Sequence, residues 1–322
     1  MTIRLLVLLL IVTGCSATPA PAVGGPAGDR HGRIEVPGRP QEPRPPFPYR
    51  SEDVVYRNGE VDLAGTLTLP EGPGPFTALL LITGSGRQDR DETVAGHKPF
   101  LVLADALTRA GYAVLRVDDR GVGGSSGDLA GADYDELVGD IVVGVEYLRS
   151  RPDVERVGLF GHSEGGYLAP LAVQRTADIA FVVSMAGAAV PGDQVLELQE
   201  RLVLDASGLP PDQIEAQVAA VRKLIGLLRA EDYIGARAPA RHVLAGEGVP
   251  PDQIDAKVPH LASRHIRALV LHDPAPSLDA LAVPVLALYG GKDLQVQPTR
   301  ASRRCGRGWP TTRTSPSRSS PS

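Results

Sequence analysis

Two patterns of hydrophobic residues divide the chain after about residue 50. Residues 53–56 and 61–69 alternate between apolar and polar positions on either side of Asn58-Gly59, which predicts an antiparallel hairpin. The strand-like segments that follow are short and continuously apolar, a pattern typical of strands buried on both faces in a parallel sheet covered by helices. These runs are residues 78–82, 112–115, 157–160, 179–183 and 283–289.

Helical patterns separate the apolar runs. Residues 100–110 and 134–150 place apolar side chains three or four positions apart, and they stop at Gly111 and before Pro152. Strands and helices that alternate in this way predict an α/β fold, a mostly parallel sheet with helices on both faces. We expect residues 51–190 and 276–296 to form this core.

Residues 191–275 break the alternation. They are helical in pattern, contain no strand-like run and hold two similar segments, 208–218 and 248–258, each with Pro-Pro-Asp at a helix start. We expect a helical insertion that lies as a cap over the carboxyl edge of the sheet, where ligands of such folds bind. A peripheral helical hairpin unrelated to substrate is the alternative.

Composition sets further limits on the function. The 322 residues are 43% hydrophobic and 22% charged, which suits one domain with a subdomain. The net charge of −5 is too mild to indicate nucleic acid or an anionic membrane surface as a partner. In residues 297–322, Arg, Ser, Thr, Pro and Gly dominate and Trp309 is the only large apolar residue, so we expect a disordered tail.

The first fifty residues have the pattern of a targeting segment and a linker. Arg4 precedes an apolar core at residues 5–12, and Val12-Thr13-Gly14-Cys15 resembles a bacterial lipobox, in which cleavage precedes the Cys that then carries lipid. We therefore expect a signal peptide at 1–15, a lipid on Cys15, a disordered Pro/Gly-rich linker at 16–50, and an exported protein anchored to the cell membrane. A simple secretory signal or a short anchor is the alternative. Cys305 is the only other cysteine, so we expect no disulfide within the mature domain.

The chemistry of the chain centres on Gly161-His162-Ser163-Glu164-Gly165, which matches G-x-S-x-G. An apolar strand precedes it and a helical pattern follows, as expected of a sharp strand-to-helix turn with an exposed serine at its apex. Glycines flank the serine because neighbouring backbone passes close to them. An ordinary glycine-rich turn is the alternative.

With this turn, the chain resembles the α/β-hydrolase superfamily, and within it the esterase and serine-aminopeptidase-like (S33-type) branch. Four stretches carry the resemblance, in the expected order, and together they cover roughly residues 53–296. They are residues 83–92, residues 118–125, the Ser163 turn and residues 288–293.

The resemblance implies a role for each site residue. Ser163 is expected to be the nucleophile, and the backbone N–H groups of Glu164 and Ser85 to form the oxyanion hole. Asp293, just past a core strand, is expected to be the triad acid, with a simple turn residue as the alternative. We expect the Glu164 side chain to be exposed at the helix start, and the charged residues 89–92 and 118–120 to shape loops through ion pairs. The reaction needs no metal or organic cofactor.

One feature departs from the family. The triad histidine should follow the acid in the chain, yet none of the seven histidines comes after Asp293, and the last strand and closing helix are missing as well. We hypothesise a truncated or frameshifted hydrolase that acts on small-molecule carboxylic esters through an acyl-enzyme on Ser163 and is impaired by the missing histidine. The alternatives are a non-catalytic, lipid-anchored binding protein, a base recruited from the cap (His272), or a peptidase or thioesterase of the same fold.

Overall fold

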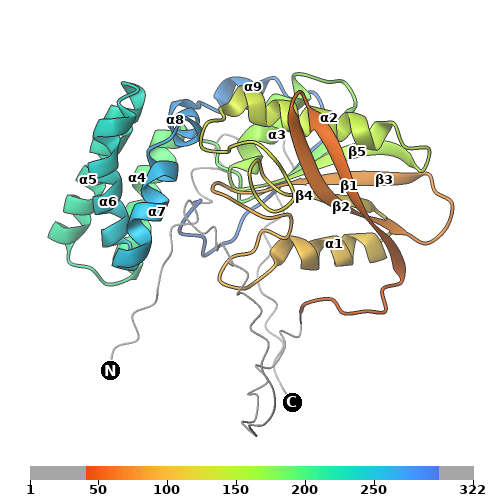
Figure 1. The fold of residues 1–322 in the computed structure, drawn as a ribbon, viewed down its shortest axis with the longest axis horizontal. Coiled ribbons are helices and arrows are strands. Elements are labelled where there is room, and N and C mark those ends of the chain that lie inside the picture. The colour runs from red at the N-terminus through yellow and green to blue at the C-terminus, as the bar shows by residue number, and fades with distance from the viewer. Residues whose placement is uncertain (1–40, 297–322) are drawn as a thin grey trace, which may run out of the picture.

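The computed structural model describes residues 41–296 and is built on a seven-stranded sheet in the order β1-β2-β4-β3-β5-β6-β7 (Figure 1). Strands β1 and β2 form the predicted hairpin, β2 pairs antiparallel with β4, and the remaining pairs are parallel. The predicted α/β class is therefore confirmed. The strands are β1 (Tyr49–Asn58), β2 (Val61–Pro70), β3 (Phe76–Ile82), β4 (Ala113–Val117), β5 (Val154–His162), β6 (Ile179–Met185) and β7 (Val285–Leu288).

Helices cover both faces of this sheet, as the continuously apolar strands require. Leu80 and Leu159 belong to the core cluster on the face covered by α2 and α3, while their neighbours Leu79 and Phe160 pack with α1 on the opposite face. Successive residues of β3 and of β5 thus supply two separate cores. The helices are α1 (Pro99–Arg109), α2 (Tyr134–Arg149), α3 (Gly165–Val173) and the short α9 (Ala275–Asp279).

A group of helices without strands follows β6 and lies to one side of the sheet (Figure 1). The two similar sequence segments begin α5 and α7, and each helix starts with Pro followed by Asp in its first turn. Pro fits the first helical position because its missing N–H has no intrahelical partner there. The helices are α4 (Gly192–Ala206), α5 (Pro211–Arg229), α6 (Tyr233–Gly246), α7 (Pro251–Leu261) and α8 (Arg264–Leu271).

The structure corrects one boundary. Strand β1 begins at Tyr49, within the predicted linker, because Tyr49 pairs with Pro70 and its hydroxyl donates to Asp105 at 2.8 Å. The predicted signal peptide, Cys15, most of the predicted linker and the predicted tail at 297–322 lie outside the described residues. Within residues 41–296, no helix is both long enough and apolar enough to cross a bilayer.

Candidate active site

Ser163 occupies a strained turn between β5 and α3. Its φ is +52°, a left-handed conformation that non-glycine residues adopt rarely. A Cβ on Gly161 would lie 2.2 Å from the Gly165 carbonyl oxygen, and one on Gly165 would lie 2.5 Å from the Ile82 carbonyl oxygen. The two glycines are required because the backbone folds back on itself on both sides of the serine. This is the geometry that the G-x-S-x-G spacing predicts.

Ser163 lines a small pocket between the core and the helical group. Ser85 and Glu164 line it from the core, and Leu196 of α4 and Leu269 of α8 close it from the other side. The last described residue, Val296, also lines this pocket. Its walls are mostly apolar, as is typical of a small-molecule site. The helices α4 and α8 therefore take part in enclosing the nucleophile.

The loop after β3 brings Ser85 beside the nucleophile. A Cβ on Gly84 would lie 3.2 Å from Ser163 Cβ, and the Gly84 N–H donates to Glu92 Oε1 at 2.7 Å. Gly86 has a φ of +101°, which only glycine adopts readily. Ser85 is buried and lines the same pocket as Ser163. The structure thus brings Ser85 and Glu164 to the nucleophile.

Glu164 is the first of the two residues whose N–H groups the sequence predicts for the oxyanion hole. It is the residue before α3, so its N–H stands at the helix terminus, where donors have no intrahelical acceptor and a developing negative charge is stabilised. Its side chain is not exposed as predicted: the residue retains only 5% of its accessible surface. The carboxylate accepts a hydrogen bond from the Tyr134 hydroxyl and lies 3.1 Å from His265 Nε2. The prediction of an exposed Glu164 side chain was wrong because Tyr134 and His265 bury it.

Asp293 lies after β7, on the turn that follows the strand. Its Oδ1 accepts hydrogen bonds from the backbone N–H groups of Gln295 at 2.8 Å and Val296 at 3.0 Å, as in an Asx-turn. The same carboxylate is close enough to His162, on the nucleophile turn, to help raise the pKa of that imidazole. The structure therefore places Asp293 near the site, but within residues 41–296 it is hydrogen-bonded to no histidine.

Two histidines near the turn, His162 and His272, make contacts with residues other than Ser163. His162 Nδ1 lies 2.7 Å from Glu92; burial lowers the pKa of His162, but the Glu92 carboxylate outweighs it and the net shift is upward. His272 packs between Tyr134 and Tyr167, with ring centroids 5.2 and 4.7 Å away, and burial lowers its pKa, so it is neutral at pH 7. Within residues 41–296, the Nε2 of His272 has no hydrogen-bond partner and no histidine is bonded to the Ser163 hydroxyl.

The charged residues on the loops after β3 and β4 form ion pairs, as predicted. Arg90 donates to Asp118 through two nitrogens, at 3.1 and 2.7 Å, and Arg116 pairs with Asp91. Burial raises the pKa of Asp119 to about 7, although the Gln88 N–H and the Thr83 hydroxyl donate to its carboxylate and oppose the shift.

A cavity of about 80 Å³ lies beside this polar cluster, between α2 and the sheet. Its apolar wall includes Leu80 and Ile141, and Asp119, Glu164 and His265 line it as well. Sequence reasoning missed the contribution of His265, because it lies 101 residues from Glu164 and no spacing links the two. Within the described part of the chain, no group of three or more His, Cys, Asp or Glu side chains could hold a metal ion.

Solved structures share this architecture. An esterase from Pyrococcus furiosus matches with a TM-score of 0.52 at 15% identity, over 81% of this chain and 76% of that one. A proline iminopeptidase-related protein from Thermus thermophilus matches with a TM-score of 0.52 at 23% identity, over 82% of this chain and 88% of that one. The chain has the α/β-hydrolase fold.

Sequence comparisons find hydrolases among the proteins similar to this chain. The sequence model of the serine aminopeptidase family S33 matches residues 98–217. Esterase EstD of Thermotoga maritima is 31% identical over 252 residues, which are 78% of this chain but only 54% of that esterase. Human dipeptidyl peptidase 8 is 35% identical over 121 residues, which are 35% of this chain and 13% of the peptidase. The chain thus spans about half the length of the esterase relative.

Proposed function

We propose that the protein hydrolyses small carboxylic esters through an acyl-enzyme on Ser163. The observation that carries the proposal is the strained Ser163, with its φ of +52° between two glycines that tolerate no Cβ. Such strain persists only where the surrounding structure enforces it, and it is typical of functional positions. The likeness to Esterase EstD supports an ester as the substrate class.

The reaction follows from the groups around the serine. The Ser163 hydroxyl attacks the ester carbonyl, and the N–H groups of Ser85 and Glu164 stabilise the negative charge that develops on the carbonyl oxygen. The alcohol leaves, and water then releases the acid from the serine. We assign Asp293 the role of the triad acid, which in a complete triad would orient the histidine that accepts the serine proton. In this chain, we propose that water takes that proton and that the leaving alcohol takes its proton from water.

The proton acceptor sets the expected rate. Within residues 41–296 no histidine is bonded to the Ser163 hydroxyl, so we propose that this part of the chain works mainly through its oxyanion hole and binding pocket. Those two alone supply roughly 10³–10⁴-fold over water, whereas a complete triad does better by about 10⁴–10⁶ in kcat.

Turnover of short-chain nitrophenyl esters tests this assignment. The comparison is between the present chain and one in which a family-like segment carrying a histidine follows Asp293, each rate divided by the amount of folded protein. We expect the extended chain to be faster by about 10⁴ or more. Rates within about tenfold of one another would reject a missing base. A rate that then fell in His272→Gln would assign the proton transfer to His272, whose neutral imidazole suits a base.

We also propose that the protein is exported and held at a membrane by lipid on Cys15. The support is the lipobox-like Val12-Thr13-Gly14-Cys15 and the Pro/Gly-rich segment after it. Such a tether would hold the hydrolase close to a bilayer while leaving its pocket free to meet substrate.

A further inference from the structure

Glu164 carries a buried carboxylate that ester hydrolysis does not require. Its N–H belongs to the oxyanion hole, while its side chain points into the protein, where the Tyr134 hydroxyl donates to Oε1 at 2.8 Å. His265 Nε2 lies 3.1 Å from Oε1 and 3.1 Å from Oε2. A buried carboxyl group is costly unless it is paired and hydrogen-bonded, so these contacts compensate for the burial of the Glu164 side chain.

The two partners come from different parts of the fold. Tyr134 is the first residue of α2, on the core, and His265 is the second residue of α8, in the helical group that encloses the Ser163 pocket. His265 is 1% exposed, and its backbone N–H donates to the Ala130 carbonyl at 3.3 Å. The Glu164 carboxylate is therefore bonded both to the core, through Tyr134, and to the helical group, through His265.

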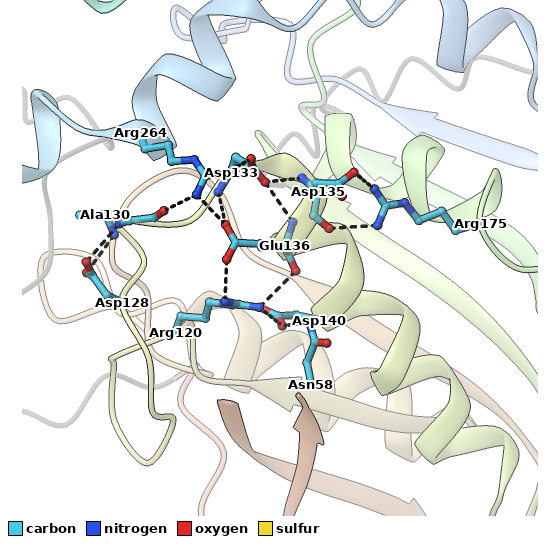
Figure 2. A network of polar contacts seen from close by, with 11 residues as sticks. Asn58, Arg120, Asp128, Ala130, Asp133, Asp135, Glu136, Asp140, Arg175 and Arg264 are labelled. Atoms are coloured by element: carbon cyan, nitrogen blue, oxygen red, sulfur yellow. Dashed lines mark hydrogen bonds and ion pairs between the residues drawn. The ribbon is translucent and has the colours of Figure 1, made fainter. Parts of the chain in front are cut away.

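A second contact holds the same end of α8 at the surface. Arg264 reaches from α8 to Asp133 at 2.5 Å and to Glu136 at 3.3 Å, on the first turn of α2 (Figure 2). The Arg264 side chain is 51% exposed, so its ion pairs are screened and weak, whereas the His265 contact is shielded from solvent. Adjacent residues of α8 thus make two contacts that can be compared: Arg264 forms ion pairs at the surface, and His265 contacts Glu164 in the interior.

The groups facing His265 favour its charged form. Burial lowers the pKa of His265, but Glu164 outweighs it, Asp119 adds to the effect, and the net shift is upward. His260 of α7 is the remaining titratable neighbour, with its ring centroid 5.4 Å away. His265 Nδ1 has no protein partner within residues 41–296, and the ring borders the 80 Å³ cavity, which is large enough for water to bond it.

We propose that His265 is a positioning residue that fixes the oxyanion hole from the cap. Its imidazolium holds the Glu164 carboxylate, and this anchors the backbone N–H of Glu164 beside Ser163 while α8 closes the pocket. The inference rests on the proposed function, because it assumes that this N–H stabilises the reacting oxyanion. A charge-assisted hydrogen bond is roughly twice as strong as a neutral one, so the anchoring weakens when His265 loses its proton.

The direction of the pH effect follows from the raised pKa. The charged pair is complete below the ordinary histidine pKa of about 6.5 and is lost as pH rises through the higher value of the folded protein. His265→Gln keeps a neutral donor without the charge. We therefore compare the nitrophenyl acetate kcat of His265→Gln with that of the wild-type chain from pH 5 to pH 9, because the ratio cancels the pH dependence of the chemistry itself.

We expect the ratio to be about 0.1 at pH 6 and to approach 1 at pH 9, with KM changing less than threefold. The tenfold loss is smaller than the 10²–10³ that follows outright removal of an oxyanion donor, since the N–H remains present. Arg264→Ala, the matched control one residue away, should keep a ratio near 1 throughout. A ratio for His265→Gln that is flat with pH, or equal to that of Arg264→Ala, overturns the proposal.

A second measurement does not depend on catalysis. The pKa of the His265 imidazole, read by NMR in the wild-type chain and assigned with His265→Gln, should lie above 6.5 and fall in Glu164→Gln. A value below 6.5, or one unchanged in Glu164→Gln, overturns the ion pair even if a variant folds poorly. Failure of the proposed function is recognised separately, as the absence of any acyl adduct on Ser163 in a chain whose His265 pKa is raised.

Discussion

At the scale of single residues, close backbone packing excludes side chains on both sides of Ser163. The turn around Ser163 leaves no room for a side chain at Gly161 or Gly165, since each Cβ would overlap a carbonyl oxygen. The sequence spacing predicts these positions and Ser163. It does not predict the burial of Glu164, because the partner His265 is distant in the chain and becomes a neighbour only when α8 packs on α2.

Gly165→Ala should destabilise the fold by about 1–3 kcal/mol, because the new methyl group would lie 2.5 Å from the Ile82 carbonyl oxygen and force the backbone apart. Thermal unfolding measures the effect. Gly226→Ala is the control: it lies within α5, meets nothing within 4 Å and should stabilise by about 0.5–1 kcal/mol. Equal melting temperatures for the two variants would show that the turn is not as tight as described.

At the scale of elements, the strands follow directly from the sequence. Each short apolar run overlaps a strand that has at least one parallel neighbour. Such strands are buried on both faces, which favours apolar residues at successive positions. The ends of the strands are less predictable. Strand β1 extends back to Tyr49, whose hydroxyl bonds to Asp105 of α1, and no local sequence pattern predicts that contact. The helical group likewise follows from its pattern, but its contact with the nucleophile depends on how α4 and α8 pack.

The helical group contains a buried acidic pair. Glu200 of α4 is 1% exposed and Glu247, at the end of α6, is 8% exposed. Burial raises the pKa of both carboxyl groups, and for Glu247 the neighbouring Glu200 adds to the effect. A carboxyl group whose folded pKa is raised costs stability as pH rises above its unfolded value, so these helices should weaken from about pH 4.5 upward until both groups are ionised.

Glu247→Gln should remove this cost, because the amide stays neutral at every pH. We expect the variant to gain about 1–3 kcal/mol at pH 8 and to show a flatter dependence of stability on pH between 5 and 8. Urea unfolding at several pH values measures it. Glu215→Gln, at an exposed residue of α5 whose pKa is lowered by its hydrogen bond with Arg201, should leave the dependence between pH 5 and 8 unchanged, because that group titrates at lower pH. A wild-type stability that rises between pH 5 and 8, with no gain in Glu247→Gln, would contradict the burial of this pair.

At the scale of the whole molecule, we expect the proposed lipid anchor and the proposed activity of the core to be separable. Cys15→Ala should abolish incorporation of labelled palmitate in a bacterial host and move the protein out of the membrane fraction. The ester-hydrolysis rate per folded molecule should not change, because the proposed reaction uses Ser163 and the described residues that line its pocket and needs no lipid on Cys15. Equal palmitate incorporation in the variant would rule out this anchor.

The proposed reaction requires that Ser163 is the residue that carries the acyl group. The most direct measurement is mass-spectrometric peptide mapping after prolonged exposure of the full chain to a fluorophosphonate probe, with Ser163→Ala treated in parallel. We expect one adduct, on Ser163, which forms slowly and is absent from the variant. An adduct on another residue, or labelling that persists in Ser163→Ala, would contradict the proposed reaction.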